Sequence, residues 1–546
     1  MIFPLRSHIT RLCNVLAAGI CILAFSVGLA EFAYPQNPGQ LDPGFGDSGR
    51  VVLDIGLIDH CEVMVSDADG NIYFGGSVLE VGAITRQEYL IGKLTPDGTL
   101  DTTFGHAGLL KGEFASGLLS RISDLKLSDE HLFFMGETSD PLRPDTQQVF
   151  IGKLDWDGNW INSFGTNGLF TNVFLSGSVK AGSFDVLPGE KLIWCGMTLD
   201  TLPWHYEIPL VVRLNPDGSL DSTFGGTGAL TWSPAGGMVS LNQRTAAHSE
   251  GGKFEAILAE PDGYLLAGAL YSGSSSEGLI LRIDTTGAPD PAFGINGRLS
   301  INFAPTWSTV FKEIRKWGND YLFGGTLLNY DSNEDFFLAA SDALGAGLEM
   351  DGVDFSGLED RAFDLNVDAY GKILLVGQSV DPSHGTLGSQ SDQISFAALD
   401  DLEQLSPTFG QAGKFTWSPT SGADAGGTAI CLTPNEQITI GGYLVDTSSS
   451  NFSDLVFLRL TNGLATSEPG PLHSQPIRVY SVYPNPSSDV LYVLGLDGRA
   501  SGNIINSLGM VVMKQAPLQG GIDVSKLPAG IYYLEIDNTY VPFAKR

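Results

Sequence analysis

The chain has 546 residues, of which only 17% are charged, and its formal net charge at pH 7 is −32. The acidic excess lies between the two ends, because residues 31–477 hold 22 basic against 57 acidic groups. Such a field repels nucleic acid and anionic membrane surfaces, so nucleic-acid binding is excluded as a function class.

The first 30 residues have the order of an export signal. Arg6 and Arg11 supply positive charge, an apolar run follows over residues 15–29, and small residues lead to Ala30. We predict a signal peptide over residues 1–30 that is cleaved after Ala30. The alternative, a membrane anchor, needs about 20 apolar residues, more than this run offers. No other apolar stretch is long enough, so we expect no integral membrane span in the mature chain.

A turn-rich phrase then recurs with a period of about sixty residues. Its form at 94–108 is LTPDGTLDTTFGHAG, and the first intervals between its Phe-Gly pairs are 59, 60 and 60 residues. Glycines at fixed offsets indicate backbone positions with positive φ, and the phenylalanine between them is predicted to plug the turn. A fixed period of this length indicates a repeat architecture. The repeated phenylalanines are Phe45, Phe104, Phe164, Phe224, Phe293 and Phe409.

Short apolar runs lie between these turns. One run in each of seven units ends in glycine, as in IYFGG at 72–76, and runs such as YLIGKL at 89–94 follow it. Each unit contains four such segments and no helical pattern. We therefore predict an all-β fold, a seven-bladed β-propeller over residues 40–465. The run-ending glycines are Gly76, Gly136, Gly196, Gly268, Gly325, Gly377 and Gly442.

The two ends of the repeat region complement each other. The first unit begins at Phe45 and supplies only a last strand, residues 50–55, whereas the final unit stops after its third strand, residues 455–460. We predict that the first segment completes the last blade and closes the ring.

The repeated DGxLDxxFGxxG phrase resembles the delta-60 repeat family of bacterial surface and secreted proteins. The resemblance covers about residues 40–465 and implies a propeller-like fold without implying any catalytic residue. It departs at 341–357, where the Phe-Gly-x-x-Gly signature is lost. We expect the outer edge of that blade to be rebuilt.

Residues 466–477 form a linker bearing proline and serine, after which the repeat ends. Residues 478–546 resemble the type A C-terminal sorting domain of the type IX secretion system. The resemblance implies a small β-sandwich, recognition by the type IX machinery of a Gram-negative cell, and a secreted or surface-attached product. An ordinary appended sandwich domain is the alternative. The matching sorting-motif residues are Tyr483, Pro484, Asn485, Pro486, Gly509, Asp523, Leu527, Pro528, Gly530 and Tyr532.

Cofactor chemistry has little support in the sequence. The eight histidines show no metal-ligand spacing, and three cysteines after the signal form no disulfide framework. Calcium is the one ion considered, because residues 331–335 (DSNED) alternate oxygen ligands and Asp342 stands at the twelfth position. Phe336 occupies the place where a calcium loop needs glycine, which favours an acidic hairpin tip. We assign no catalytic, cofactor-binding or metal-binding residue.

Two classes of function remain. The acid pairs Glu359-Asp360 and Asp400-Asp401 would suit a polysaccharide-active hydrolase or lyase. The aromatic loop at 204–206 and the repeated Thr-Trp-Ser-Pro at Trp232 and Trp417 would suit binding of a glycan or protein. Both tryptophans follow their Phe-Gly by eight residues, which favours packing between blades. We expect a monomeric binding or scaffold module, with the polysaccharide-active enzyme as the alternative.

Overall fold

The structure is a computed structural model that describes residues 37–462 and 481–546 with internal gaps. The predicted signal peptide, its cleavage at Ala30 and the linker at 466–477 lie outside the described residues. The gaps are 82–84, 116, 141, 172–173, 175–177, 200–206, 234–236, 241–250, 273–274, 302–307, 329–333, 354–359, 381–391, 403, 420–422, 446–452, 484–486, 495–500, 507–510, 519–520, 529 and 537–538.

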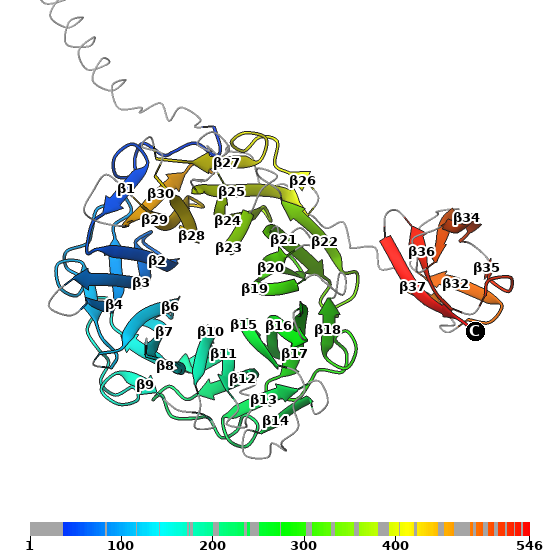
Figure 1. Ribbon diagram of the computed structural model, residues 1–546, viewed down its shortest axis with the longest axis horizontal. Coiled ribbons are helices and arrows are strands. Elements are labelled where there is room, and N and C mark those ends of the chain that lie inside the picture. The colour runs from blue at the N-terminus through cyan, green and yellow to red at the C-terminus, as the bar shows by residue number, and fades with distance from the viewer. Residues whose placement is uncertain are drawn as a thin grey trace, which may run out of the picture.

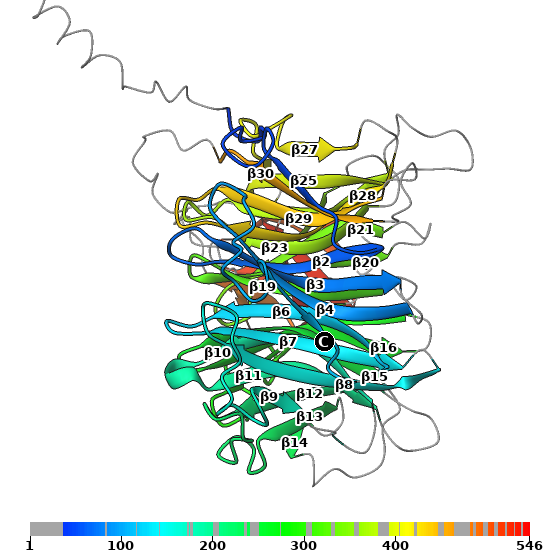
Figure 2. The same cartoon turned by 90° about the vertical axis from the view of Figure 1, so that its left-hand side faces the viewer.

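Seven antiparallel sheets surround a central axis as the blades of a propeller (Figures 1 and 2). Blade 1 holds β2 (Ile58–Ser66), β3 (Ile72–Val81), β4 (Thr85–Leu94) and β5 (Leu109–Gly112). Blade 2 holds β6 (Leu119–Leu127), β7 (Leu132–Asp140), β8 (Arg143–Leu154) and β9 (Leu169–Thr171). Blade 3 holds β10 (Val179–Val186), β11 (Leu192–Leu199), β12 (Glu207–Leu214), β13 (Ala229–Ser233) and β14 (Gly237–Ser240).

Blade 4 holds β15 (Gly251–Glu260), β16 (Gly263–Ser272), β17 (Ser275–Asp284) and β18 (Arg298–Ile301). Blade 5 holds β19 (Ser308–Trp317), β20 (Asp320–Leu328), β21 (Glu334–Ser341) and β22 (Glu349–Val353). Blade 6 holds β23 (Asp360–Val367), β24 (Ile373–Val380), β25 (Asp392–Asp401), β26 (Gln404–Leu405) and β27 (Lys414–Trp417). Blade 7 holds β28 (Ala425–Leu432), β29 (Ile438–Leu444), β30 (Asp454–Leu460) and β1 (Arg50–Leu53). Blades 3 and 6 thus carry a fifth short strand beyond the four predicted.

The ring closes as predicted. Strand β1 pairs antiparallel with β30, with Arg50 opposite Leu458 and Leu53 opposite Leu455. The closing segment also begins earlier than the predicted start at Phe45. The Gly39 amide donates to the Thr461 carbonyl at 2.7 Å, so the chain from residue 37 supplies the turn that would follow β30. The reason is visible in the sequence, because NPGQLD at 37–42 stands where blade 3 has NPDGSLD.

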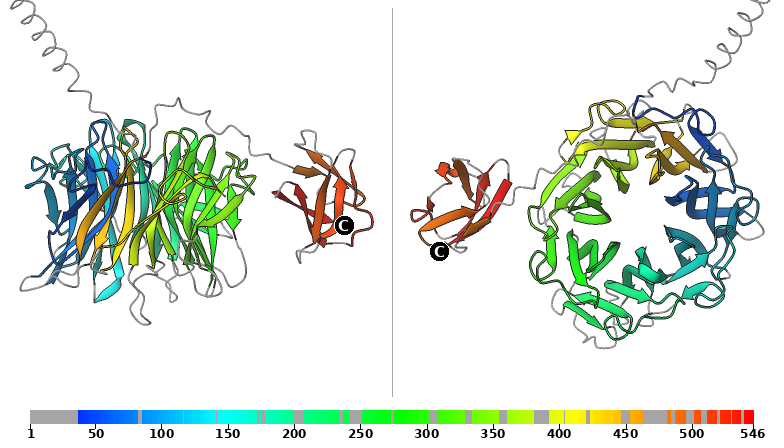
Figure 3. Two further views of the ribbon diagram at one scale, coloured as in Figure 1. Left: turned by 90° about the horizontal axis from the view of Figure 1, so that it is seen from above. Right: turned by 180° about the vertical axis from the view of Figure 1, so that it is seen from behind.

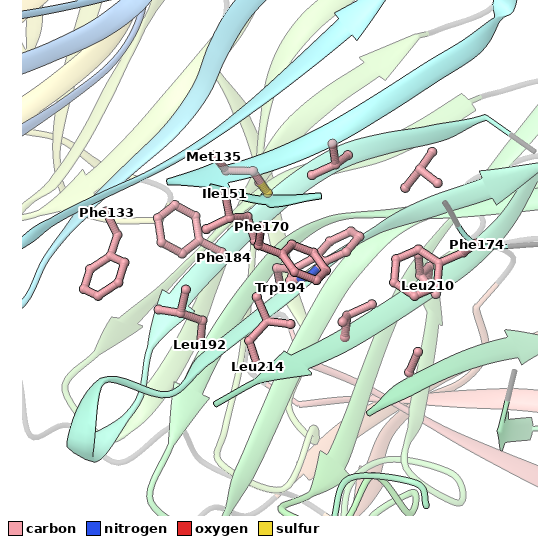
Figure 4. Close-up of a cluster of buried hydrophobic side chains, with 14 of the residues drawn as sticks. Phe133, Met135, Ile151, Phe170, Phe174, Phe184, Leu192, Trp194, Leu210 and Leu214 are labelled. Carbon is pink, nitrogen blue, oxygen red and sulfur yellow. The ribbon is translucent and has the colours of Figure 1, made fainter. Parts of the chain in front are cut away.

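The hydrophobic core lies between neighbouring blades. The cluster between blades 2 and 3 joins Phe133, Met135 and Ile151 of one blade to Phe184 and Trp194 of the next (Figure 4). Both faces of each blade are apolar because a neighbouring blade packs on each of them. Burial of such inter-blade faces, repeated around the ring, holds the propeller together.

The repeated phenylalanine is a plug, as predicted, but it packs against the next blade. Phe104 of the blade 1 turn is fully buried. A Cβ added to Gly158, in the turn of blade 2, would lie 3.0 Å from the Phe104 ring. The adjacent Gly105 amide donates to the Asp157 carbonyl at 2.8 Å. Each Phe-Gly pair therefore ties its own blade to the following one.

A cation on the third strand holds this turn in blade 3. The Arg213 guanidinium contacts Asp221 at 2.9 Å and lies 4.9 Å from the centre of the Phe224 ring. It also donates to the Thr285 carbonyl of blade 4 at 2.5 Å. These charged residues of the repeat are structural, and Lys93, Lys153, Arg282 and Arg459 take the corresponding position in other blades.

Blade 5 is the one that lacks the Phe-Gly turn. Its outer strand β22 still pairs with β21, with Ala339 opposite Met350. The turn before it keeps its link to blade 4, because the Gly294 amide donates to the Leu344 carbonyl at 2.7 Å. The rebuilt outer edge of blade 5 is thus a shortened connection between β21 and β22 that lacks the buried phenylalanine of the other turns.

The C-terminal residues form two sheets of their own (Figure 3). One contains β31 (Ser481–Tyr483), β32 (Val490–Leu494) and β35 (Ile522–Asp523); the other contains β33 (Ser501–Asn506), β34 (Val511–Pro517), β36 (Gly530–Ile536) and β37 (Thr539–Lys545). Leu491 and Ile522 of the first sheet share a buried cluster with Ile504 and Leu534 of the second. Two sheets over one core is the arrangement of a small sandwich. Among the residues that the structure describes, no helix has the length and hydropathy of a membrane span.

Candidate functional site: the charged central channel

The innermost strands of all seven blades surround the axis of the ring (Figures 1 and 3). Residues on these strands line a channel along that axis. Its volume is about 970 Å³. This is within the range of small-molecule sites in other proteins. The strands that form the wall are β2, β6, β10, β15, β19, β23 and β28.

Every inner strand carries a β-bulge at the same place. In β2 the register shifts between Cys61 and Val63, so that Glu62 is the extra residue. A bulge redirects the side chains around it, and here those side chains line the channel. The extra residues in chain order are Glu62, Ser123, Gly182 with Ser183, Glu255, Lys312, Phe363 and Thr428.

The glycine that ends each apolar run lies opposite this bulge. Gly268 pairs with Phe254, next to the extra residue Glu255. A Cβ on Gly268 would lie 2.1 Å from the Lys253 carbonyl oxygen, a backbone atom that cannot rotate away. The repeated run-ending glycine is therefore required by the channel wall. It was the sequence signal that could have located the bulges.

Replacing Gly268 by alanine is expected to lower the free energy of unfolding by about 3 kcal/mol or more, since the added Cβ must displace backbone. The matched control is Gly251→Ala in the paired strand, where the nearest atom lies at 3.4 Å. That variant is expected to stay within about 1 kcal/mol of the parent. Chemical denaturation of both variants measures the difference, and equal stability would contradict this role of the glycine.

Charges of both signs face the channel, and they are paired. Arg121 contacts Glu137 at 2.5 Å and Glu62 at 3.8 Å. Lys312 contacts Glu255 at 3.0 Å, which joins blades 5 and 4. The Arg121–Glu62 and Lys312–Glu255 contacts thus link neighbouring blades, whereas Arg121–Glu137 lies within blade 2.

Arg315 is the centre of the densest group. Its guanidinium contacts Glu313 at 2.5 Å and Asp364 of blade 6 at 3.2 Å. Burial raises the pKa of Asp364, and the nearby Glu313 carboxylate raises it further, while Arg315 opposes both effects. Two carboxylates thus share one guanidinium on the channel wall.

The carboxylate of Asp364 is also a link between blades. One oxygen accepts the Leu365 amide at 2.7 Å, and the other accepts the Ile430 amide of blade 7 at 2.8 Å. Asp124 does the same in blade 2, because it accepts the Phe184 amide of blade 3 at 3.1 Å. Both acids follow a bulge, so the bulge turns them toward the neighbouring blade. Sequence reasoning missed the channel charges, since no local motif marks them.

Of the acid pairs singled out in the sequence, the described residues Asp360, Asp400 and Asp401 do not line this channel. Asp360 is fully buried in β23, and its partner Glu359 lies outside the described residues. Asp400 contacts Lys372 at 2.5 Å, and Asp401 accepts the Leu402 amide at 2.8 Å. The described carboxylates of these pairs thus have roles away from the channel wall.

The two repeated tryptophans pack between blades, as favoured above. Trp232 is only 4% exposed and shares a cluster with residues of blades 3 and 4. Trp417 packs against the cluster between blades 6 and 7. The aromatic loop at 204–206 lies outside the described residues.

Part of the suggested calcium loop, residues 331–333, lies outside the described residues. Asp335 is on β21, and Asp342 follows the end of that strand. The Asp342 carboxylate accepts the Leu344 and Ala346 amides of its own turn. Its role is that of a turn residue.

A cluster of two glutamates and a histidine already has hydrogen-bond and ion-pair partners within the protein. Glu130, His131 and Glu190 bring ligand atoms within 4.8 Å of one another. Glu190, however, contacts Lys153 at 2.6 Å and accepts Ser128 at 2.7 Å, besides contacting His131. Burial alone would raise its pKa, but these hydrogen bonds lower it to about 2. Its oxygens have protein partners, as expected of an ion-pair network.

The three cysteines that follow the predicted signal are buried and free. Cys61 and Cys431 belong to the same cluster between blades 7 and 1, and Cys195 lies between blades 3 and 4. Burial raises the pKa of each thiol. They serve as core side chains.

The sorting-motif residues that are described have structural roles. The Asp523 carboxylate accepts the Ser525 amide at 3.0 Å and opens a turn through Leu527, which packs on the sandwich core. The Tyr532 hydroxyl donates to the Pro528 carbonyl at 2.9 Å. Gly530 begins β36 and Tyr483 ends β31, whereas Pro484, Asn485, Pro486 and Gly509 lie outside the described residues.

Comparison with family models identifies this C-terminal region. Residues 481–545 match the secretion system C-terminal sorting domain. The chain ends in a type IX sorting domain. The protein is therefore a secreted or cell-surface protein of a Gram-negative bacterium, handled by the type IX secretion machinery. Residues 209–224, one copy of the repeated phrase, match a β-propeller domain of unknown function, DUF5122.

Comparison with curated proteins found no match. Similar solved structures include a phage phi92 endosialidase, with TM-score 0.38 and 9% identity over 86% of this chain and 79% of that one. A protein of unknown function from Dyadobacter fermentans has TM-score 0.36 and 9% identity over 77% and 100%. A mutant NanB sialidase from Streptococcus pneumoniae has TM-score 0.35 and 11% identity over 79% and 71%. At these TM-scores the likenesses carry no inference about function.

Proposed function

We propose that this exported propeller is a binding or scaffold module whose ligand, a glycan or a protein, binds in the central channel. The observation that carries the proposal is the channel wall itself. Seven bulges direct a set of charged, polar and aromatic side chains into one space of about 970 Å³. Each charge there has a partner, which favours recognition by a fixed polar surface over acid–base chemistry.

The wall offers two kinds of contact. Ion pairs such as Arg121–Glu137 and Lys312–Glu255 present donors and acceptors on opposite sides of the channel. Phe363, the extra residue of the blade 6 bulge, is 39% exposed, a large value for a phenylalanine on an inner strand. An aromatic face beside polar groups suits the stacking of a sugar ring or the insertion of a protein side chain.

A polysaccharide-active enzyme is the second candidate, and one observation favours it. Glu313 and Asp364 flank Arg315, and burial raises the pKa of Asp364. Glycoside hydrolysis uses a pair of carboxyl groups, and the pKa of the acid member is raised. Against it, both Asp364 oxygens accept backbone amides, so neither is free to protonate a leaving group.

The test is a glycan array probed with the exported protein, combined with an activity screen on the same sugars. The matched variants are Phe363→Ala in the channel and Tyr370→Ala on an exposed turn, where the side chain is 43% exposed. Binding without turnover that falls at least tenfold in Phe363→Ala, and is unchanged in Tyr370→Ala, supports the proposal. Turnover that is lost in Asp364→Asn would replace it with the enzyme.

A further inference from the structure

Three carboxylates converge at the seam where the ring closes. Asp54 directly follows β1, Asp59 is on β2 of blade 1, and Asp454 begins β30 of blade 7. One ligand oxygen from each lies within 4.8 Å of the other two. We call this cluster of Asp54, Asp59 and Asp454 the seam site. It joins residues 54–59 to Asp454, two segments that are far apart in the sequence.

Asp59 is the unusual member of the seam site. Its side chain is fully buried, and its Oδ2 accepts the Ile55 amide at 2.8 Å and the Gly56 amide at 3.2 Å. Its Oδ1 is also buried and has no hydrogen-bond partner. A buried carboxylate oxygen without a partner is costly, so this atom is available to contact a ligand.

The backbone around the seam site is fixed by hydrogen bonds across the closure. The Asp59 amide donates to the Ser453 carbonyl at 3.0 Å, and the Ser453 amide donates to the Leu57 carbonyl at 3.3 Å. The Leu57 amide in turn donates to the Leu79 carbonyl at 2.8 Å. The carboxylates therefore sit on a rigid frame and meet without a loop having to close.

We propose that the seam site binds one calcium ion, held by the carboxylates of Asp54, Asp59 and Asp454 and completed by water. Calcium takes oxygen ligands at about 2.3–2.6 Å, so ligands on opposite sides of the ion are at most about 5 Å apart. The separations in the seam site satisfy this limit. A partly exposed Asp54 leaves room for the water ligands that calcium accepts.

The electrostatics agree with a cation at this position. Burial raises the pKa of Asp59 to about 6, and the Asp454 and Asp54 carboxylates add to the effect. An ion with two positive charges removes the repulsion that these carboxylates exert on one another. The net charge of −32 also concentrates cations around the chain. This site is distinct from residues 331–342.

The expected consequence is that calcium stabilises the closed ring. The ion would join residues 54–59 to Asp454, and these two segments lie together only when β1 is docked on blade 7 beside blade 1. A ligand that binds only the closed form shifts the equilibrium toward it by mass action. Calcium should therefore slow hydrogen exchange in β1 and at the start of β2.

The experiment uses the exported protein after treatment with EDTA and follows calcium chloride titration by calorimetry. The variants are Asp454→Asn, Asp54→Asn and Asp59→Asn, the last of which keeps an oxygen for the Ile55 amide. The control is Asp47→Asn, an exposed carboxylate in the turn before β1 with the same change of charge. Hydrogen exchange of β1 is measured with and without calcium, with β15 and β16 as internal reference.

We expect calcium binding at the seam to weaken at least tenfold in Asp454→Asn and Asp54→Asn and to be unchanged in Asp47→Asn. Protection of β1 by calcium should be lost in the same two variants. Asp54 is exposed and Asp454 is partly exposed, so we expect these two variants to fold. The test therefore does not depend on whether Asp59→Asn folds. No calcium binding by the parent protein, or unchanged binding in Asp454→Asn, would overturn the proposal. Tighter binding of magnesium than of calcium would overturn the choice of ion.

Discussion

Replacing Phe45 by alanine is expected to lower the free energy of unfolding by about 3–5 kcal/mol, the usual effect of emptying a buried phenylalanine site. Phe45 is fully buried at the seam. The Arg459 guanidinium carbon lies 4.1 Å from the centre of its ring, and a Cβ added to Gly98 of blade 1 would lie 2.8 Å from the ring. The variant therefore loses a plug and the cation–π contact of the closing segment together.

Two comparisons isolate the contribution of closure. Ile295→Ala, at a position 80% exposed, is expected to change stability by less than about 0.5 kcal/mol. Phe104→Ala removes the equivalent plug within a continuous part of the chain. Only Phe45→Ala should raise hydrogen exchange in β1 selectively. Equal exchange of β1 in the two phenylalanine variants would contradict a special role for the seam.

Replacing Arg315 by methionine is expected to cost about 3 kcal/mol at pH 7, because it leaves Glu313 and Asp364 on the channel wall without their shared cation. The cost should depend on pH. The folded-state pKa of Asp364 is raised by burial, and loss of Arg315 raises it further. Since the folded variant then binds protons more tightly than the unfolded chain, its stability falls as pH rises from about 4 toward neutrality.

The measurement is chemical denaturation at pH 5 and pH 7. The control is Arg86→Met, which removes an arginine that is 57% exposed and 3.6 Å from Glu113. An exposed pair of this kind contributes about 0–1 kcal/mol. A deficit in Arg315→Met that matches the control, or that is the same at both pH values, would show that the three-residue group does not stabilise the wall.

The blade architecture could be predicted because short sequence motifs in each repeat unit specify its turns and strands. The Phe-Gly pairs, the turn glycines and the short strands recur at one period, and each has a local conformational cause. Ring closure could be predicted by counting strands. The final repeat unit lacks a fourth strand, and the first unit supplies only such a strand. Phe45 and Phe409 obey the same rule as the continuous units, since both are fully buried.

The sorting domain was also readable from the sequence. Described motif residues stand at turns and strand ends, as Leu527 and Gly530 show, where local conformation limits the choice of residue. The family comparison covers the same part of the chain, residues 481–545. The characteristic spacing of the motif residues was therefore sufficient to identify the sorting domain.

The channel charges required the tertiary structure. Sequence patterns assign strand faces by simple alternation, and a bulge at Glu62 or Phe363 inserts one residue and changes the face of those that follow. Arg315 and Asp364 belong to different blades, so their contact has no local signature. The run-ending glycines marked the bulges, but only the pairing partner explains them.

By itself, the sequence determined the period of the fold, the units that must complete each other and the export route. These depend on short-range conformational preferences and on matched repeats. Only the tertiary structure decided which side chains share the channel wall, and which carboxylates meet at the seam. Asp59 and Asp454 are 395 residues apart along the chain, and ring closure alone brings them within 4.8 Å.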